Sequence, residues 1–518
     1  MRLPGCIILL VVLRVAAVAQ GGDGTVDESW PMYLGPDGTA VGRLERPWDP
    51  SKATKIWESA DPIAPGRVVD GRRAGSDESK ATPHSGGFAS PVVADGRVYI
   101  FSYRPSGDVF DKRALSRMGI SAADAVAAAK KNDPTGDALL VSEPNKWAIA
   151  ADDIITCIDA RTGKTLWRRV FKQAGVNWNM FSKGGPALTP AVAEGRVFAV
   201  GTLGAVYCLD ARSGEPVWES SIGPRHEKMK GLRAASLKDG NAPRFNRDFL
   251  ASPLVADGVV LCSDEAKFKV IRGDGDKWEY HYEARNGLIA LDAATGKTLW
   301  SRPNSCSEVG PVIWRSGTKA YAIASDVEGM AALDLRTGHE LWSIKEGHRA
   351  WWAASARGDY LLINPGSGDE TGPTVCYRIS HDKAERLWQL PAAQGRPIGN
   401  AAIVDNRAYI NSRAAAALLC IDLPTGKLLG SFGVPVLNGE HDNAFVACYA
   451  GRVFTSNGRD QRGLLVADAD PKAWSSSKPY TWPVQTTIGY IVPVVPAFAA
   501  GTVYIRTDKG LAAYALRP

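Results

Sequence analysis

The chain has 518 residues, among them 53 Gly, 32 Pro and 16 Trp, and its 61 basic residues stand against 55 acidic ones. A net charge of only +6 at this length argues against a nucleic-acid-binding function. The abundant glycine and proline are typical of many short strands joined by turns. A chain of this length usually forms several domains, but a repeat architecture can use it as one unit.

Residues 1–19 are expected to be a signal peptide. Met1-Arg2 is a short basic start, Ile7 to Val12 is apolar, and Ala17-Val18-Ala19 offers a small-x-small cleavage site. The sequence thus predicts export to the periplasm or the extracellular space, with a retained membrane anchor as the alternative. No later segment is long and apolar enough to be expected to span a membrane.

Residues 20–52 form a lead-in rich in turn residues, which we expect to lie across one face of the fold. The next residues, ATKIWE from Ala53 to Glu58, are typical of a lone strand ending in Trp57. At the other end, Gly501 to Leu516 has strand character but no second hairpin after it. The simplest prediction is that the fold closes on itself into a ring. The strand at Ala53 to Glu58 would then pair with the C-terminal strands, complete their sheet and remove its exposed edge.

A ten-residue phrase recurs through residues 53–518 and predicts a β-hairpin each time. It reads IDARTGKTLW from Ile158, LDARSGEPVW from Leu209, LDAATGKTLW from Leu291, LDLRTGHELW from Leu333 and, with Gly430 in place of Trp, IDLPTGKLLG from Ile421. The glycine suits a turn position with positive φ, and the aspartate can bond its own turn. A repeated acidic functional site is the alternative, and turn chemistry favours the hairpin. The tryptophans are expected to pack between neighbouring units.

A second phrase precedes each of these hairpins, as in SPVVADGRVYIFS from Ser90 and TPAVAEGRVFAVG from Thr189. It predicts two strands joined by a two-residue turn, so one unit has four antiparallel strands. The prediction is an all-β, eight-bladed propeller with blades at about 88–170, 186–220, 250–301, 309–345, 352–390, 399–432, 444–484 and 495 to the end with Trp57. Seven blades would follow if the region near Trp388 or Trp482 is misread.

Three insertions interrupt the repeat, at about 103–153, 220–248 and 266–286. The first contains a predicted short helix, Ser121 to Lys131, and the second is a basic surface excursion. In the third, Asp274 and Asp276 can bind a cation or simply form a turn; the full spacing of a calcium loop is absent, which favours the turn.

The cysteines are expected to be buried apolar residues. Cys157, Cys208 and Cys420 occupy matching positions on the third strand of their blades. The sequence contains no CxxC pair and no CxxCH haem-attachment motif, so it gives no support for metal binding by cysteine.

The repeats resemble the pyrroloquinoline-quinone (PQQ)-like propeller family, whose blades carry an Ala-x-Asp-x-x-[ST]-Gly-x-x-x-Trp docking motif. The lead-in WPMYLGPDGTAVG also resembles the opening of exported members from bacteria such as the planctomycetes. The resemblance implies one of two functions. Quinoprotein dehydrogenases hold the quinone and a calcium ion at the mouth of the ring, where a carboxylate acts as the base on an alcohol or sugar. Other members are binding propellers without a cofactor.

The adjacent cysteine pair typical of the dehydrogenases is missing here. Binding groups of propellers lie in loops at the mouth of the ring, so we expect the loops before the inner strands to supply them. Catalytic candidates are Glu308, His441 and Asp442; cofactor-binding candidates are His84, Trp178, Asn179, Arg244, Asn246, Trp352, Arg396 and Asn400. Solvated turns, bracing contacts and packing between blades are the structural alternatives for these residues. No metal ligand is assigned.

The sequence contains neither a GxSxG nor an HExxH motif, which leaves hydrolytic chemistry without support. We therefore expect an exported monomer that binds an envelope protein or a small molecule at the mouth of the propeller. The alternative is a dehydrogenase dependent on PQQ and calcium, and fold alone does not decide between the two.

Overall fold

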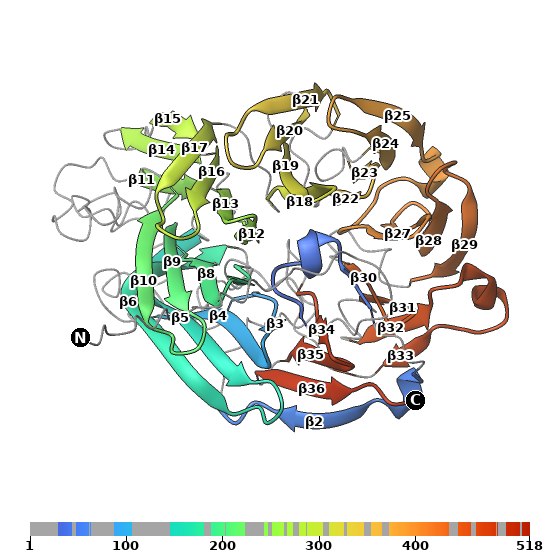
Figure 1. The fold of residues 1–518 in the computed structure, drawn as a ribbon, viewed down its shortest axis with the longest axis horizontal. Coiled ribbons are helices and arrows are strands. Elements are labelled where there is room, and N and C mark those ends of the chain that lie inside the picture. The colour runs from blue at the N-terminus through green and yellow to red at the C-terminus, as the bar shows by residue number, and fades with distance from the viewer. Residues whose placement is uncertain are drawn as a thin grey trace, which may run out of the picture.

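The strands form a ring of eight antiparallel blades, as Figure 1 shows. The computed structural model describes residues 29–518 except 44–47, 62, 64–86, 106–145, 181–187, 203, 223–242, 247–250, 264–266, 273–278, 286, 304–309, 326–328, 347–353, 365–371, 435–443, 457–462, 483, 485–493 and 508–509. Only the backbone is described for residues 105, 146–151, 173, 176–180, 243–246, 267–272 and 279–285. The expected signal peptide lies outside the described residues.

Blades 1 to 4 follow one another along the chain, each running from its inner to its outer strand. Blade 1 contains β3 (Val92–Ala94), β4 (Arg97–Pro105), β5 (Lys146–Asp159) and β6 (Thr165–Met180). Blade 2 contains β7 (Ala191–Ala193), β8 (Arg196–Val200), β9 (Ala205–Asp210) and β10 (Pro216–Ser221). Blade 3 contains β12 (Leu254–Ala256), β13 (Val259–Ser263), β16 (Gly287–Asp292) and β17 (Thr298–Pro303). Blade 4 contains β18 (Val312–Ser316), β19 (Lys319–Ser325), β20 (Met330–Asp334) and β21 (Glu340–Ile344).

Blades 5 to 8 complete the ring and confirm the count of eight over seven. Blade 5 contains β22 (Ser355–Arg357), β23 (Tyr360–Ile363), β24 (Val375–Ile379) and β25 (Ala384–Gln389). Blade 6 contains β26 (Ala402–Val404), β27 (Arg407–Ser412), β28 (Ala417–Asp422) and β29 (Leu428–Gly433). Blade 7 contains β30 (Val446–Tyr449), β31 (Arg452–Ser456), β32 (Leu464–Asp468) and β33 (Tyr480–Trp482). Blade 8 contains β34 (Ala497–Ala499), β35 (Thr502–Arg506), β36 (Leu511–Ala515) and β2 (Thr54–Glu58).

The turns have the geometry that their residues predict. In the first hairpin of blade 1, Asp95 and Gly96 both have positive φ, 49° and 67°, which matches the twist of the flanking strands. In the second hairpin, Asp159 Oδ1 accepts hydrogen bonds from Thr162 N and Thr162 Oγ1, both at 2.7 Å. The recurring aspartate is therefore used within its own turn, as the hairpin interpretation requires.

A tryptophan from the outer strand of one blade contacts the second hairpin turn of the next. Trp167 Nε1 donates to the Ala211 carbonyl over 3.1 Å, and the indole lies against Gly214. The same N–H to carbonyl contact, at 2.7–3.0 Å, joins Trp57 to Ala160, Trp218 to Ala293, Trp300 to Leu335, Trp342 to Ser380 and Trp388 to Leu423. These contacts give each buried indole N–H the acceptor that it needs.

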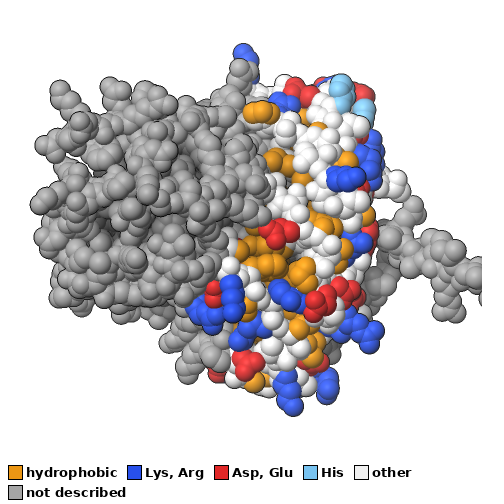
Figure 2. Space-filling model, turned by 90° about the vertical axis from the view of Figure 1, so that its left-hand side faces the viewer, with side chains coloured by type: hydrophobic (Ala, Val, Ile, Leu, Met, Phe, Trp, Pro, Cys, Tyr) orange, Lys and Arg blue, Asp and Glu red, His pale blue; other side chains and the backbone are white. Residues whose placement is uncertain are grey.

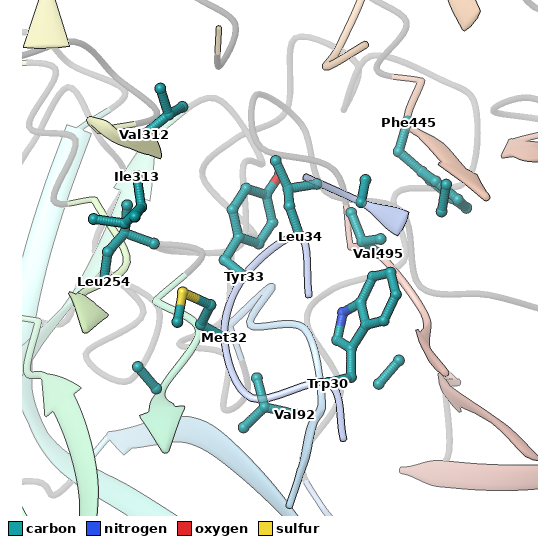
Figure 3. Packing of buried hydrophobic residues seen from close by; sticks show 14 of the residues in the cluster. Trp30, Met32, Tyr33, Leu34, Val92, Leu254, Val312, Ile313, Phe445 and Val495 are labelled. Carbon is teal, nitrogen blue, oxygen red and sulfur yellow. The ribbon is translucent and has the colours of Figure 1, made fainter. Parts of the chain in front are cut away.

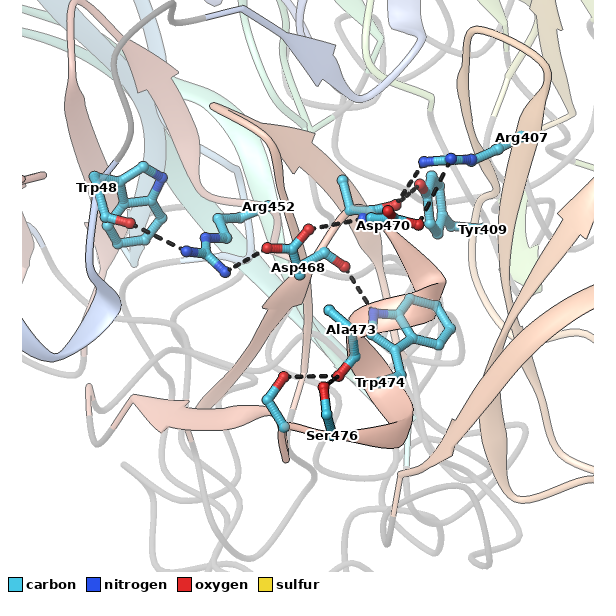
Figure 4. Close-up of polar contacts among 11 residues, drawn as sticks. Trp48, Arg407, Tyr409, Arg452, Asp468, Asp470, Ala473, Trp474 and Ser476 are labelled. Atoms are coloured by element: carbon cyan, nitrogen blue, oxygen red, sulfur yellow. Dashed lines mark hydrogen bonds and ion pairs between the residues drawn. The ribbon is translucent and has the colours of Figure 1, made fainter.

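We call the contact between two neighbouring blades a seam. The seam between blades 6 and 7 differs from those above, because blade 6 has Gly430 where the tryptophan would be. The short helix η9 (Pro471–Ser475) of blade 7 supplies Trp474, whose ring packs edge-on to Phe432 at 4.8 Å. Its Nε1 donates to Asp468 O over 2.7 Å. Figure 4 shows this indole beside the Arg452–Asp468 ion pair, in which Nη1 and Oδ2 are 3.0 Å apart.

The N-terminal strand closes the ring, as expected. β2 pairs antiparallel with β36, with Thr54 opposite Ala515 and Glu58 opposite Ala512. The short helix η2 (Pro50–Lys52) precedes β2, and Asp49 N donates to the Arg517 carbonyl over 2.9 Å. The two ends of the described chain thus form one blade without a covalent turn between β36 and β2.

The lead-in lies on the axis of the ring, against the inner strands near their first hairpin turns. Trp30, Met32, Tyr33 and Leu34 are buried among the inner strands, with the labelled side chains shown in Figure 3. The short helix η1 (Pro36–Gly38) and strand β1 (Val41–Gly42), parallel to β30, follow them. The reason is hydrophobic: a run of large apolar side chains is stabilised by burial, and the ring offers an apolar interior.

The insertions lengthen one blade and form one additional sheet. β4 and β5 continue pairing through Pro105 and Ala151, so the ends of the 103–153 insertion belong to blade 1. β11 (Pro243–Asn246), β14 (Lys267–Arg272) and β15 (Glu279–Arg285) join the other two insertions in a separate three-stranded sheet. The expected helix at 121–131 and the Asp274–Asp276 turn lie outside the described residues.

The outer rim carries scattered apolar side chains, many immediately before a seam tryptophan. Leu166, Val217 and Leu299 are exposed on the outer strands of blades 1, 2 and 3. Figure 2 shows hydrophobic side chains on this side of the ring, interspersed with basic and acidic ones. Single exposed apolar residues of this kind are ordinary on a soluble surface.

Candidate functional site

The predicted site residues fall into three groups in the structure. Five lie outside the described residues and stay predictions: His84, Glu308, Trp352, His441 and Asp442. For four more, only the backbone is described: Trp178, Asn179, Arg244 and Asn246. The remaining two, Arg396 and Asn400, have described side chains.

The four residues with a described backbone lie in strands rather than in loops, which corrects the loop assignment. Trp178 and Asn179 belong to the end of β6, opposite Ala148 and Trp147 of β5. Arg244 and Asn246 belong to β11 and pair with Lys269 and Lys267 of β14. Sequence reasoning missed these strands because β11 lies in an insertion and the end of β6 runs past about residue 170, where the repeat pattern ended blade 1.

Asn400 forms a bracket between blades 6 and 7. Its Nδ2 donates to Val446 O over 2.7 Å and to Ala401 O over 3.2 Å, and its Oδ1 accepts from Val446 N at 3.2 Å. The side chain is 3% exposed. Its amide oxygen and nitrogen are therefore both engaged with backbone, as expected for a buried polar group.

Arg396 lies between η7 (Ala392–Gln394) and β26 in the chain. Its side chain is exposed, its φ is 53°, and its carbonyl accepts from Arg413 N over 2.9 Å. Neither described candidate is placed as a calcium ligand, because the amide oxygen of Asn400 is bonded to Val446 N and Arg396 is a cation.

A belt of hydrogen bonds joins the entries of neighbouring inner strands. Val495 N donates to Ser90 Oγ over 2.8 Å, Ser90 N to Thr189 Oγ1 over 2.9 Å, and Thr189 N to Ser252 Oγ over 3.0 Å. The belt therefore runs from the entry of blade 8 through blades 1 and 2 to blade 3. The signal for it was present in the recurring [Ser/Thr]-Pro pair at the start of the second phrase, to which sequence reasoning gave no role.

The lead-in is bonded to the inner strands through its backbone. Trp30 N donates to Val93 O over 2.7 Å, Val192 N donates to Pro31 O over 2.7 Å, and Cys448 N donates to Ala40 O over 2.8 Å. Trp30 also packs edge-on to Phe498 of blade 8, with ring centroids 5.1 Å apart. The described part of the ring axis is thus filled by the chain itself.

An ion-pair group holds the lead-in to blades 3 and 4. Arg315 Nε lies 2.7 Å from Asp37 Oδ1, and Arg315 Nη1 lies 3.1 Å from Asp257 Oδ1. Asp257 Oδ2 also accepts from Ala320 N over 2.8 Å. Because these groups are partly exposed, we expect this arrangement to position the lead-in more than to stabilise the fold.

A buried carboxylate stands at the interface of blades 1 and 2. Asp153 is fully buried on β5, where it accepts from Thr202 Oγ1 over 2.9 Å and from Tyr207 Oη over 3.1 Å. Its neighbour Asp152 pairs with Arg104 at 2.8 Å. The sequence did not indicate this pair, since both aspartates lie at the end of an insertion.

The described cysteines have no catalytic character. All six are buried and free of disulfides, as expected for Cys157, Cys208 and Cys420. Burial raises the pKa of Cys157 and of Cys262 to about 12, so both remain thiols at neutral pH. Within the described ranges no group of three or more His, Cys, Asp or Glu side chains is arranged to hold a metal ion.

An eight-bladed ring with repeated seam tryptophans defines the class of protein as a β-propeller. A family model described as "Outer membrane protein assembly factor BamB" matches residues 151–428, more than half of the chain. The chain belongs to this family of PQQ-like repeat propellers.

Curated relatives include dehydrogenases and envelope proteins. The glycerol dehydrogenase large subunit of Gluconobacter thailandicus is 26% identical over 51% of this chain and 41% of its own length. The polyvinylalcohol dehydrogenase of Sphingopyxis sp. is 25% identical over 60% and 49%. The outer membrane protein assembly factor BamB of Burkholderia pseudomallei is 22% identical over 42% and 69%. The matched region is thus less than half the length of either dehydrogenase.

Among solved structures, the quinohemoprotein alcohol dehydrogenase of Comamonas testosteroni has a TM-score of 0.46 at 12% identity, with 94% of this chain and 80% of that chain covered. BamB from Moraxella catarrhalis has a TM-score of 0.36 at 13% identity, with 70% and 78% covered. In the described part of this chain, no helix has both the length and the apolar character of a membrane span.

Proposed function

We propose that this protein is an exported propeller that acts as a binding or scaffold module in the cell envelope. The observation that carries the proposal is the filled ring axis. Trp30, Met32, Tyr33 and Leu34 are each no more than 6% exposed and pack among the inner strands. A ring whose centre is hydrophobic core is a rigid platform, which leaves its loops and rim for recognition.

The partner is an envelope protein or a small molecule at the mouth of the ring, and the protein itself is a monomer. The family match and the Burkholderia relative support the envelope setting, since both carry the description of an outer membrane protein assembly factor. No nucleic-acid partner is proposed, because the net charge of +6 is small for 518 residues.

A dehydrogenase dependent on PQQ and calcium is the second candidate, and the two dehydrogenase relatives favour it. Glu308, His441 and Asp442 are its catalytic candidates, and His84 and Trp352 remain candidates for the cofactor. No reaction step is derived through the quinone, because the three catalytic candidates lie outside the described residues.

The experiment that separates the two functions titrates the purified protein with PQQ and calcium, followed by absorbance and thermal shift. A ligand that binds only the folded state raises the melting temperature by mass action. We expect no saturable shift. Saturable stabilisation, followed by dye reduction with an alcohol, would overturn the binding role in favour of the dehydrogenase.

A second experiment tests the binding role directly. It measures binding of the purified protein to purified outer-membrane assembly factors from the same organism by surface plasmon resonance. We expect saturable binding with a Kd in the micromolar range or below, about −8 kcal/mol or stronger. Absence of binding to all of them would remove the assembly role from the proposal.

A further inference from the structure

A pocket of about 210 Å³ lies on the face of the ring that carries the hairpin turns, between the lead-in and blades 4 and 5. Its charged lining comes from Asp37, Arg43, Arg315 and Arg357, and Val41 and Ile313 contribute apolar walls. Three arginines and a single aspartate thus line one small space.

Three carboxylates lie near these arginines: Asp37 and Asp257 are bound to Arg315, and the charge of Asp405 acts on Arg357 to raise its pKa. Arg315 takes both Asp37, at 2.7 Å, and Asp257, at 3.1 Å. Within the described part of the chain, Arg43 and Arg357 have no acidic side chain at ion-pair distance. The residues that line the pocket thus include three arginines and one aspartate, and that aspartate is paired with Arg315.

Arg357 is held in place at the pocket wall. Its Nη1 donates to the Ile403 carbonyl of blade 6 over 2.9 Å, which fixes one edge of the guanidinium, and the residue lines the pocket. Burial lowers the pKa of Arg357 and the nearby Arg43 lowers it further, while the charges of Asp405 and Asp37 act in the opposite direction. Two like charges at one partly buried site repel each other unless an anion lies between them.

We propose that this pocket binds a small oxyanion, either a phosphate or a short carboxylate, between Arg43 and Arg357. Guanidinium groups match the geometry of both anions and bind them through paired N–H donors. The volume lies below the usual range for drug-sized ligands, so a small anion is the occupant that fits.

The site is separate from the proposed function. It lies at the hairpin turns, as Gly358 between β22 and β23 shows, whereas the mouth candidates precede the inner strands. Loss of anion binding would therefore leave the envelope role untouched, and a negative result with assembly factors would leave the anion site untouched.

The test titrates the purified protein with inorganic phosphate and, separately, with succinate, by calorimetry at constant ionic strength. Constant ionic strength removes general screening from the comparison. We expect saturation with one of the two probes, and the one that binds identifies the anion class. Arg43→Gln, at an exposed position, should weaken binding at least about tenfold.

Arg357→Gln should weaken binding to a similar extent. Arg212→Gln is the matched control, because it removes the same charge from an exposed turn outside the pocket. Even if Arg357→Gln does not fold, Arg43→Gln still decides the question. No saturation with either probe, or saturation that Arg43→Gln leaves unchanged, would overturn the proposal.

Discussion

At the scale of single residues, the glycine of each second hairpin turn meets two separate constraints. Gly214 has a φ of 72°, and a Cβ there would lie 2.6 Å from the indole of Trp167. Gly195, in the first hairpin of the same blade, has a φ of 70° but open space around the Cβ position. Substitutions at these two glycines therefore distinguish the cost of backbone strain from the cost of a clash with the tryptophan.

We expect Gly214→Ala to lower the free energy of unfolding by about 2–4 kcal/mol, from left-handed strain plus overpacking. Gly195→Ala, its control, should cost only about 1 kcal/mol, from the backbone alone. Calorimetric melting of both variants measures the difference. Equal losses would show that the indole contact adds nothing to the cost of a side chain at this turn.

The turn aspartates also predict a pH dependence. Burial opposes ionisation of Asp334, but hydrogen bonds from Lys319 and Thr337 outweigh it and lower the pKa to about 2. A folded-state pKa below the unfolded value contributes stability above about pH 4, which is lost as the pH falls toward 2. The melting temperature should therefore fall across this range.

Asp334→Asn should reduce this dependence, since its amide does not titrate. Melting curves of the protein and the variant between pH 2 and pH 6, about the interval over which carboxylates titrate, make the comparison. Parallel curves would mean that Asp334 has an ordinary pKa in the folded protein.

At the scale of elements, most neighbouring blades share one tryptophan contact, and blades 6 and 7 use another. Where Gly430 interrupts the tryptophan series, η9 brings Trp474 from the following blade into contact with Phe432. A Cβ at Gly430 would lie 2.9 Å from Pro471 Cβ, so a larger residue there would collide with η9. The missing tryptophan and the extra helix are thus two parts of one packing solution.

Trp474→Ala should lower the free energy of unfolding by about 3 kcal/mol, because it leaves a cavity between blades 6 and 7. Denaturant unfolding measures the loss. Trp474→Phe is the control that keeps most of the ring surface and should recover more than half of it. A loss below about 1 kcal/mol in the alanine variant would contradict the packing role.

At the scale of the whole molecule, closure depends on residues separated by most of the chain. Trp57 of β2 is 8% exposed and donates to Ala160 O of blade 1 over 2.9 Å, while β2 itself pairs with β36. This is the one described blade assembled from both ends of the chain, so its seam closes the ring.

Trp57→Ala should cost about 3–5 kcal/mol and allow β2 to detach. Limited proteolysis followed by mass spectrometry should find early cleavage N-terminal to blade 1. Trp218→Ala, which opens a seam inside the ring, is the control and should not release that fragment. Identical fragments from both variants would argue against closure by β2.

The sequence by itself determined the features that depend on local chemistry. The period of the two hairpin phrases predicted the four-stranded blades, their number and the closing strand, because turn residues and strand alternation act within a few positions. It also predicted that Cys157, Cys208 and Cys420 are buried, since their position in the repeat places them on the third strand of a blade.

Only the tertiary structure decided where non-repeating segments lie. The entry of the lead-in into the ring, the pairing of β11 with β14, the bracket at Asn400 and the pocket between Arg43 and Arg357 all join residues far apart in the chain. The physical reason is that these contacts depend on burial and charge across blades, which the repeat period does not encode.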